Sequence, residues 1–358
     1  MKKIVLIIIM ILLLLVTWVQ GEKIGVLTEV LKPDSIEVSK DRLYVVEGAT
    51  FYVYSLKDLG FITTFGKNGE GPGELKVVPM FSNRIKALHD KLFAEGMSKV
   101  IFFSKDATLL REIRKKGGFT TFKVMPIKEN FAAVRMLNPT EKDKKYYLAL
   151  SLLDPEMNVK KILYKQEFPE REKDIIMVTD SIHFEVYNDK LYVEESERGF
   201  LIEVFDSKGD KLFEIKKNFT RQTLTEKDKA AILKNFKEDN FVRMMVKGAG
   251  GWENFKTTVN FIYPDTFPPI QDITVTDDKL YVSTYNNNKK GDKVKYIVMD
   301  LKGNIISTPY MPVPRDSSFL AKTFGRDNRF YGITNGKFYY LKENEDDEVW
   351  EVHAVEIK

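Results

Sequence analysis

The sequence contains no cysteine and only three histidines, His89, His183 and His353, in 358 residues. Without cysteine there is no disulfide, no thiol nucleophile and no cysteine-ligated zinc. The three histidines lie far apart in the sequence, so a histidine-rich metal site is not expected either. We therefore predict no catalytic residue, no metal and no cofactor from these residue types.

A strong charge of one sign is also missing. The chain has 56 lysines and arginines against 52 acidic residues, and removing the two lysines among the first 21 residues leaves 54 against 52. A nucleic-acid-binding protein is expected to carry a concentrated basic face, so we predict no nucleic-acid partner. Apolar residues make up 43% of the chain and charged residues 30%, which indicates a globular protein with a substantial core.

The one long apolar run lies at the start of the chain. The residues MKK are followed by Ile4 to Val16, and Val19 and Gly21 occupy positions −3 and −1 of a cleavage site. This is the pattern of a secretory signal peptide, so we predict cleavage after residues 1–21. An uncleaved membrane anchor is the alternative, although the uncharged run is shorter than the ~20 residues that span a bilayer. Both alternatives place the protein outside the cytoplasm, in the periplasm or secreted.

A short pattern recurs six times in the rest of the chain, as DRLYVV, DKLFAE, ENFAAV, DKLYVE, DKLYVS and NRFYGI. Each copy has a turn-forming or charged pair, an apolar anchor, and then aromatic, small or β-branched residues. The anchors are Leu43, Leu92, Phe131, Leu191, Leu280 and Phe330. Their separations are 49, 39, 60, 89 and 50 residues, and repeats of about 40–50 residues are typical of propeller blades.

The surroundings of the anchors repeat as well. An alternating segment such as SIEVS precedes the anchor, and an aromatic-rich segment such as FYVYSL, a tight turn such as DSKGD and a last strand such as KLFEIK follow. This order predicts a four-stranded antiparallel meander in each unit. We therefore predict an all-β, six-bladed β-propeller over residues 22–358, closed by the segment at Trp350 to Ile357 or by Ile24 to Val30. A β-sandwich would not need one pattern six times, and a helical solenoid would need a 3.6-residue period.

The 89-residue interval after the fourth anchor is too long for one blade, and we predict a helical insertion at residues 222–270, between the fourth and fifth blades. Thr223 with Glu226 matches a capping box, and Thr225 is the rival first cap. One helical face would carry Ala230, Leu233, Phe236, Phe241 and Met244, and Gly248, Gly250 and Gly251 would end the helix. The aromatic segment that follows is predicted to be a loop with at most one strand. The insertion either covers a blade edge, which we favour, or forms a lid or partner-docking element.

The stretch FGKNGEGPGEL, from Phe65 to Leu75, is rich in glycine. A phosphate loop would need Lys-Ser/Thr after its last glycine and then a helix, and a dinucleotide loop would need a βαβ unit. Neither is present, so we predict a crossover between blades one and two, in which glycines supply positive φ and proline fixes φ. The predicted turn residues are Gly66, Gly69, Gly71, Pro72 and Gly73. The side chains left to contact a ligand are Lys67, Asn68, Glu70 and Glu74.

This stretch, followed by Pro79, resembles the signature of NHL-type blades, as found in secreted bacterial six-bladed propellers. Leu75 replaces the usual aromatic residue, and KKGGFT at residues 115–120 is a reduced copy of the turn. The blade rhythm extends the resemblance over residues 33–358. It implies a rigid, exported and mostly non-catalytic scaffold, although some related propellers are lactonases, lyases or cyclotransferases.

One mouth of a propeller channel is formed where the innermost strands begin. The residues eight positions before the anchors are Ser35, Arg84, Lys123, His183, Asp272 and Lys322. Their charges favour an anionic or carbohydrate ligand, against the alternative of ordinary solvated strand ends. The preceding positions include apolar Phe122, Ile182 and Ala321, which do not provide the oxygen ligands of a calcium site.

These observations lead to one functional prediction and one alternative. We predict an exported, non-catalytic binding or scaffold propeller whose ligand is a protein, a peptide or a glycan at the channel mouth. The alternative is an exported hydrolase or lyase, similar to a lactonase, that uses the central channel.

Overall fold

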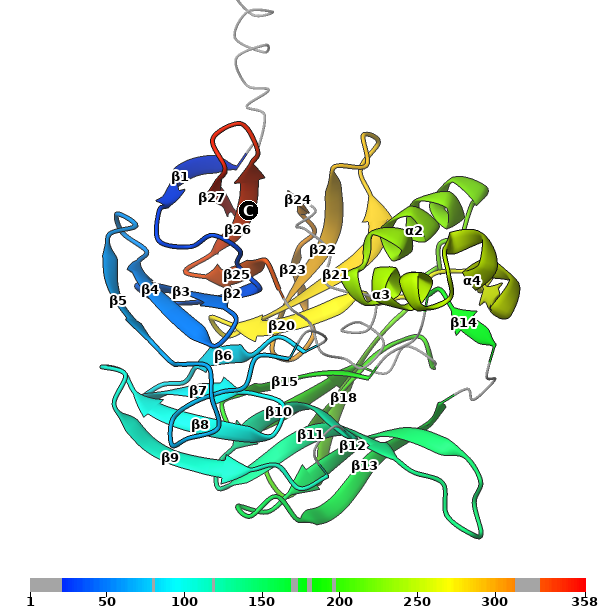
Figure 1. Ribbon diagram of the computed structural model, residues 1–358, viewed down its shortest axis with the longest axis horizontal. Coiled ribbons are helices and arrows are strands. Elements are labelled where there is room, and N and C mark those ends of the chain that lie inside the picture. The colour runs from blue at the N-terminus through cyan, green and yellow to red at the C-terminus, as the bar shows by residue number, and fades with distance from the viewer. Residues whose placement is uncertain are drawn as a thin grey trace, which may run out of the picture.

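The structure is a computed structural model that describes residues 21–78, 81–117, 120–168, 173–178, 182–194, 198–312 and 329–358. Its strands form six antiparallel sheets arranged in a ring, the predicted six-bladed β-propeller (Figure 1). The predicted signal peptide, apart from Gly21, and Lys322 lie outside the described residues.

In blades one to three the strands follow one another from the axis outward. Blade one is formed by β2 (Ser35–Ser39), β3 (Arg42–Glu47), β4 (Thr50–Ser55) and β5 (Phe61–Phe65). Blade two is formed by β6 (Arg84–Ala87), β7 (Lys91–Glu95), β8 (Lys99–Ser104) and β9 (Leu109–Arg114). Blade three is formed by β10 (Thr121–Ile127), β11 (Asn130–Leu137), β12 (Tyr146–Leu153) and β13 (Val159–Phe168).

Blades four to six repeat this order, with one addition and one exchange. Blade four is formed by β15 (His183–Tyr187), β16 (Lys190–Glu194), β17 (Phe200–Phe205) and β18 (Lys211–Lys217). Blade five is formed by β20 (Asp272–Thr276), β21 (Lys279–Asn287), β22 (Lys293–Asp300) and β23 (Ile305–Ser307), and β24 (Tyr310–Pro312) also pairs with β22. Blade six is formed by β25 (Tyr331–Thr334), β26 (Lys337–Asn344), β27 (Val349–Glu356) and β1 (Glu22–Leu27).

The two predicted closing segments both take part in closing the ring. Strand β27 is the third strand of blade six, and β1 pairs with it in antiparallel fashion as the outermost strand (Figure 1). Lys23 Nζ lies 2.7 Å from Glu351 Oε1 across this pair. The beginning and the end of the described chain are thereby held in one sheet.

The core lies between neighbouring blades, because the second and third strands of a blade are covered on both faces. In β3, Leu43, Tyr44, Val45 and Val46 are all buried, whatever their place in the alternation. The outermost strands face solvent on one side and keep exposed residues such as Phe61. A strand that is covered on both faces is expected to be a continuous apolar run. A strand that is covered on one face is expected to keep exposed residues on the other.

Five of the six sequence anchors lie in second strands, but Phe330 does not. Phe330 directly precedes the inner strand β25, and Phe338 in β26 occupies the position that the other anchors hold. The prediction that Phe330 anchors a second strand was therefore wrong. The NGKFYY segment, which contains Phe338, carries the same turn-aromatic pattern as the other anchors and is the better match.

The insertion contains three helices, α2 (Glu226–Glu238), α3 (Asn240–Gly248) and α4 (Trp252–Thr258), between β18 and β20. Thr225 is the N-cap of α2 and forms a capping box with Asp228, so the predicted box of Thr223 with Glu226 was wrong and the rival cap is confirmed. Asp239 ends α2, and its side chain accepts hydrogen bonds from the first N–H groups of α3. This second cap divides the single predicted helix into two.

The segment after the predicted helix also differs from the prediction of a loop, because α4 lies there. Strand β19 (Asn260–Ile262) then pairs in parallel with β14 (Asp174–Ile176), which precedes blade four. Phe236, Val242 and Phe255 form a separate apolar cluster with Met177 of that segment. Ala230 and Met244, from the predicted face, are exposed. Within the part of the chain that the structure describes, none of the helices is both long and apolar enough to cross a membrane.

Candidate functional site: the axial mouth

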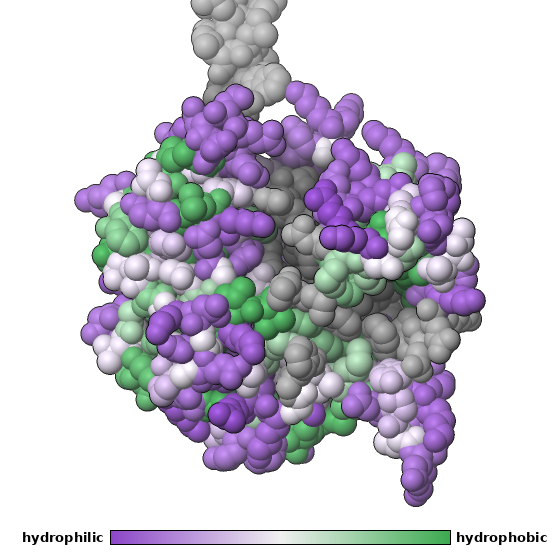
Figure 2. All heavy atoms as spheres, viewed as in Figure 1, coloured by the Kyte–Doolittle hydropathy of each residue, from purple (hydrophilic) through white to green (hydrophobic). Residues whose placement is uncertain are grey.

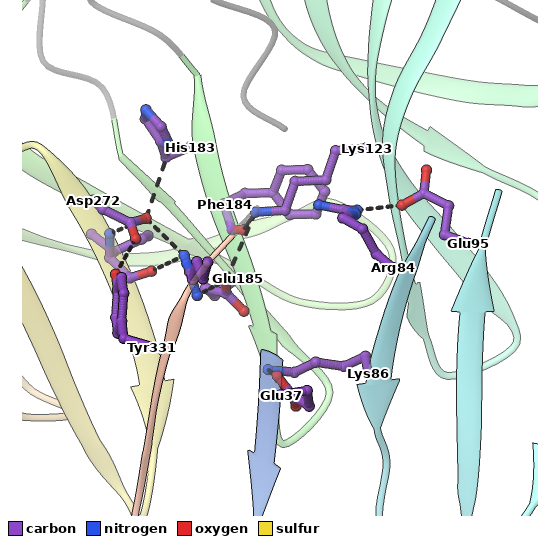
Figure 3. Close-up of polar contacts among 12 residues, drawn as sticks. Glu37, Arg84, Lys86, Glu95, Lys123, His183, Phe184, Glu185, Asp272 and Tyr331 are labelled. Carbon is purple, nitrogen blue, oxygen red and sulfur yellow. Dashed lines mark hydrogen bonds and ion pairs between the residues drawn. The ribbon is translucent and has the colours of Figure 1, made fainter. Parts of the chain in front are cut away.

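The inner strands bring five predicted mouth residues to one end of the axis. Ser35, Arg84, His183 and Asp272 begin their strands, and Lys123 lies near the start of β10. Neighbouring inner strands contact one another around the axis, and Figure 3 shows four of these side chains in a single polar cluster. Lys322, the sixth predicted residue, lies outside the described residues.

A cavity of about 60 Å³ lies at the axis among these side chains. Seven charged residues line it: the cations Arg84, Lys86, Lys123 and Arg329 and the carboxylates Glu37, Glu95 and Glu185. Strand alternation explains why Glu37, Lys86 and Glu185 join the first row, since residues two apart face the same side. Figure 2 shows a hollow near the centre of the face in view. The cavity admits water or one functional group of a ligand, rather than a whole ligand.

Glu185 lies at the centre of the charged network. Its Oε1 is 3.0 Å from Arg329 Nη1 and 3.8 Å from Lys123 Nζ. Burial alone would raise the pKa of Glu185, but the charges of Arg329, Lys123, Lys86 and Arg84 outweigh it and lower the pKa to about 2. Glu185 is therefore a fixed anion rather than a group that exchanges protons near neutral pH.

Asp272 and Arg329 connect blades five and six. Arg329 Nη2 lies 2.7 Å from Asp272 Oδ1, and the Tyr331 hydroxyl donates a hydrogen bond of 2.5 Å to Asp272 Oδ2. His183 Nδ1 lies 3.9 Å from the same carboxylate. Burial and the nearby charge of Asp272 raise the pKa of Tyr331 well above its usual value. The sequence analysis did not find Arg329, because the position eight residues before the correct anchor Phe338 is Phe330, the residue after Arg329.

Glu95 holds blades two and three together, and the sequence analysis missed it as well. It pairs with Arg84, and its Oε1 lies 2.6 Å from Lys115 Nζ and accepts a hydrogen bond of 3.1 Å from the Val124 N–H. The side chains of Lys115 and Glu95 are 0% and 1% exposed. The acidic end of the DKLFAE pattern was the available signal for this residue.

Glu37 and Lys86 form a further pair beside the cavity, with 3.1 Å between Glu37 Oε1 and Lys86 Nζ. Burial raises the pKa of Glu37 and outweighs the attraction of Lys86. Burial alone would lower the pKa of Lys86, but the charges of Glu37 and Glu185 outweigh it and raise the pKa. Glu37 thus accepts a proton more readily than Glu185 does.

The predicted contact residues of the glycine-rich crossover lie apart from the cavity lining and interact with one another. Glu74 accepts a hydrogen bond of 3.0 Å from the Gly71 N–H and lies 3.0 Å from Lys67 Nζ. Glu70 lies 2.7 Å from Lys76 Nζ. These charges therefore stabilise the turn locally, and their role toward a ligand stays a prediction.

Backbone geometry accounts for two of the four glycines of this crossover, Gly66 and Gly73, which have positive φ. Gly66 has a φ of +82°, and a Cβ there would lie 2.4 Å from the Ala49 carbonyl oxygen. The Asn68 side chain accepts a hydrogen bond of 3.0 Å from the Val77 N–H. Leu75, at the end of the motif, is buried between blades one and two. The side chain that replaces the usual aromatic residue thus packs in the core.

Within the residues that the structure describes, no group of three histidine, aspartate or glutamate side chains is arranged so that it could hold a metal ion. Asp272, His183 and Glu185 are instead connected through Arg329 or through one another.

Comparison with known proteins defines the fold. No family model matches the chain, and no curated protein matches it. Among solved structures, the "Putative exported protein" of Bacteroides fragilis NCTC 9343 is 12% identical, with 95% of each chain covered and a TM-score of 0.51. A DUF4221 family member from Bacteroides vulgatus ATCC 8482 is 10% identical, with 94% of this chain and 96% of that chain covered and a TM-score of 0.51. These likenesses show the fold alone, and the resemblance to NHL-type blades stays a prediction.

Proposed function

We propose that this protein is an exported, non-catalytic binding propeller that recognises a protein, peptide or glycan at the mouth of its channel. The observation that carries the proposal is the axial cavity, lined by four cations and three carboxylates. A ligand would insert one polar or charged group there, while the rest of it lies across the mouth.

The cost of burying charges supports a binding role for the network. Replacing a buried ion pair by well-packed apolar residues is often neutral or stabilising, so such pairs are weak contributors to stability. Charges such as Arg329 and Glu185 at the axis are better explained by the recognition of a polar ligand.

Export is supported by the pattern of residues 1–21 and by the name of one structural neighbour. Expression in a bacterial host with a secretion pathway tests it by N-terminal sequencing of the extracytoplasmic protein. A mature chain that begins at Glu22 is the expected result. An uncleaved chain in the membrane fraction would show that residues 1–21 are a membrane anchor rather than a signal peptide. A chain confined to the cytoplasm would contradict export.

The binding role is tested on peptide and glycan arrays with the purified chain. We expect at least one reproducible ligand whose binding falls in Arg84→Gln, because Arg84 lines the cavity and its Nε has no hydrogen-bond partner. Arg111→Gln, on the exposed face of β9, is the matched control and should bind normally. A protein that binds nothing on either array, or binds equally well without Arg84, would contradict the proposal.

The exported hydrolase or lyase is kept as a second candidate because of Glu37. This carboxylate lines the cavity and its pKa is raised by burial, as is expected for a general acid. Product formation from a panel of lactones and uronate-containing glycans, lost in Glu37→Gln, would favour this candidate over simple binding. No turnover by the unchanged protein would eliminate it.

A further inference from the structure

Arg135 lies near the mouth, one strand away from the axis. It is close to the end of β11, where it pairs with Thr121 at the start of β10, and its neighbour Val134 pairs with Lys123. The loops that join second and third strands lie at the same mouth as the beginnings of the inner strands. Arg135 is therefore placed beside the axial site, over blade three.

The Arg135 side chain is partly buried, yet it has no partner. Within the described ranges no hydrogen bond or ion pair involves it, and its Nε is buried without a hydrogen bond. Burial lowers the pKa of Arg135. Buried polar atoms normally find a partner, so the unsatisfied Nε needs an explanation.

The neighbouring cations of the mouth are in a different situation. Arg84 and Lys115 share the Glu95 carboxylate. Lys123 donates a hydrogen bond of 2.7 Å to the Phe184 carbonyl oxygen and lies near Glu185. Among the described residues named here, the four cations Arg84, Lys115, Lys123 and Arg135 are accompanied by two carboxylates, Glu95 and Glu185, and an excess of cations attracts an anionic ligand.

Gly117, in the crossover from blade two to blade three, lies beside the Arg135 side chain. Its φ is +93°, and a Cβ there would lie 2.9 Å from Thr120 Oγ1, 3.4 Å from Thr121 Oγ1 and 3.7 Å from Arg135 Nη2. The turn between the two blades is therefore close to the guanidinium.

We propose that Arg135 binds a carboxylate of an acidic peptide that lies across the mouth over blades two and three. The inference rests on the proposed binding function and names its ligand class. A guanidinium presents a planar fork of donors that matches a carboxylate with two parallel hydrogen bonds. One carboxylate would neutralise the Arg135 charge and accept a hydrogen bond from its buried Nε.

The distribution of aromatic residues favours a peptide over a glycan. Sugar rings are usually bound on exposed aromatic faces, which combine an apolar body with a polar edge. Among the described residues, the strongly exposed aromatic side chains are Phe61 and Tyr310, on β5 and β24 rather than on the inner strands. Recognition by charge, as in acidic-motif binding to arginine clusters, fits the mouth better.

Fluorescence anisotropy with a labelled oligoglutamate peptide tests the inference. Hydrogen bonds to charged groups are stronger than those between neutral groups, so Arg135→Gln should weaken binding by about tenfold or more. Arg135→Lys keeps the positive charge but loses the planar pair of donors. Its affinity for oligoglutamate should lie between those of the unchanged protein and Arg135→Gln. Arg111→Gln should bind like the unchanged protein. Binding should also weaken as salt is added.

The outcomes separate the inference from the function on which it rests. Oligoglutamate binding that is unchanged in a folded Arg135→Gln variant would overturn the inference and leave the binding propeller standing. Binding of oligogalacturonate or inorganic phosphate, with no binding of oligoglutamate, would overturn it too. A protein that binds nothing on the peptide and glycan arrays would remove the proposed function itself.

Discussion

The crossovers after blades one and two both contain glycine turns, but their charges are arranged differently. In the first crossover Lys67 pairs with Glu74 and Lys76 pairs with Glu70. In the second, the turn at Gly117 lies against Arg135, which has no partner among the described residues.

This difference in ion pairing bears on the role of each crossover. Local ion pairs involve the charges of the first crossover, and positive φ accounts for two of its glycines, Gly66 and Gly73. Beside the second crossover the Arg135 Nε is buried without a hydrogen bond, and a bound carboxylate would supply one. The proposed carboxylate site therefore lies at the second crossover, and a role of the first crossover toward a ligand stays a prediction.

The largest loss of stability is expected when the ion pairs of Glu95 with Lys115 and Arg84, beside the second crossover, are removed. Glu95→Gln leaves Lys115 and Arg84 without their carboxylate, and Lys115 is 0% exposed. Removing one partner of a buried ion pair costs about 3–5 kcal/mol. Urea unfolding should show this loss, and a variant as stable as the unchanged protein would mean that Lys115 finds another partner or solvent.

Acidification should weaken the axial network. The pKa of Glu185 is about 2 in the folded protein and ordinarily 4.5, so its stabilisation is complete above pH 4.5 and is lost as the pH falls toward 2. The difference corresponds to about 3 kcal/mol. Between pH 4.5 and pH 2, the free energy of unfolding should fall more steeply with pH for the unchanged protein than for Glu185→Gln. Equal slopes would show that Glu185 does not interact with the surrounding cations.

The first crossover should be sensitive to its backbone rather than to its charges. Gly66→Ala places a Cβ 2.4 Å from the Ala49 carbonyl oxygen at a φ of +82°, and the strained backbone alone costs about 1–3 kcal/mol. Gly248→Ala is the control, because the space around Gly248 is open. Equal stability of the two variants in urea would refute the structural role of Gly66.

The smallest effect is expected at the exposed pair of the first crossover. Glu70 lies in an ion pair with Lys76, but the two side chains are 76% and 60% exposed. Exposed pairs contribute little because solvent screens them. Glu70→Gln should leave the midpoint of thermal unfolding and the binding of oligoglutamate unchanged. A loss of binding would move the site toward the first crossover.

The sequence was sufficient for the fold because its signals are local. Hairpins such as the one at Asp206 and Gly209 have their turn chemistry within a few residues, where the Asp206 carboxylate accepts N–H groups of the same turn. Six consecutive four-stranded antiparallel units are compatible with few all-β folds, and a six-bladed propeller is the one that uses the same unit six times. The helical insertion was found for the same reason, and its break at Asp239 was missed because a residue that caps a helix was taken for one inside it.

The site could be predicted only in part. The alignment of the anchors identified where Arg84, Lys123 and Asp272 would gather, since each begins or nearly begins an inner strand. The partners of these residues depend on how neighbouring blades meet, which no local pattern encodes. Glu95 and Arg135 lie in second strands, and their opposite situations, paired and unpaired, follow from packing between blades two and three.

Thermal unfolding of the unchanged protein and Arg135→Gln, with and without oligoglutamate, tests the central claim most directly. Because the unpaired guanidinium is costly and a ligand that binds the folded state stabilises it, we predict that Arg135→Gln unfolds at the same or a higher temperature without peptide. The peptide should raise the midpoint of thermal unfolding of the unchanged protein but not that of Arg135→Gln. A lower midpoint for Arg135→Gln, or an equal rise in both proteins, would contradict the claim.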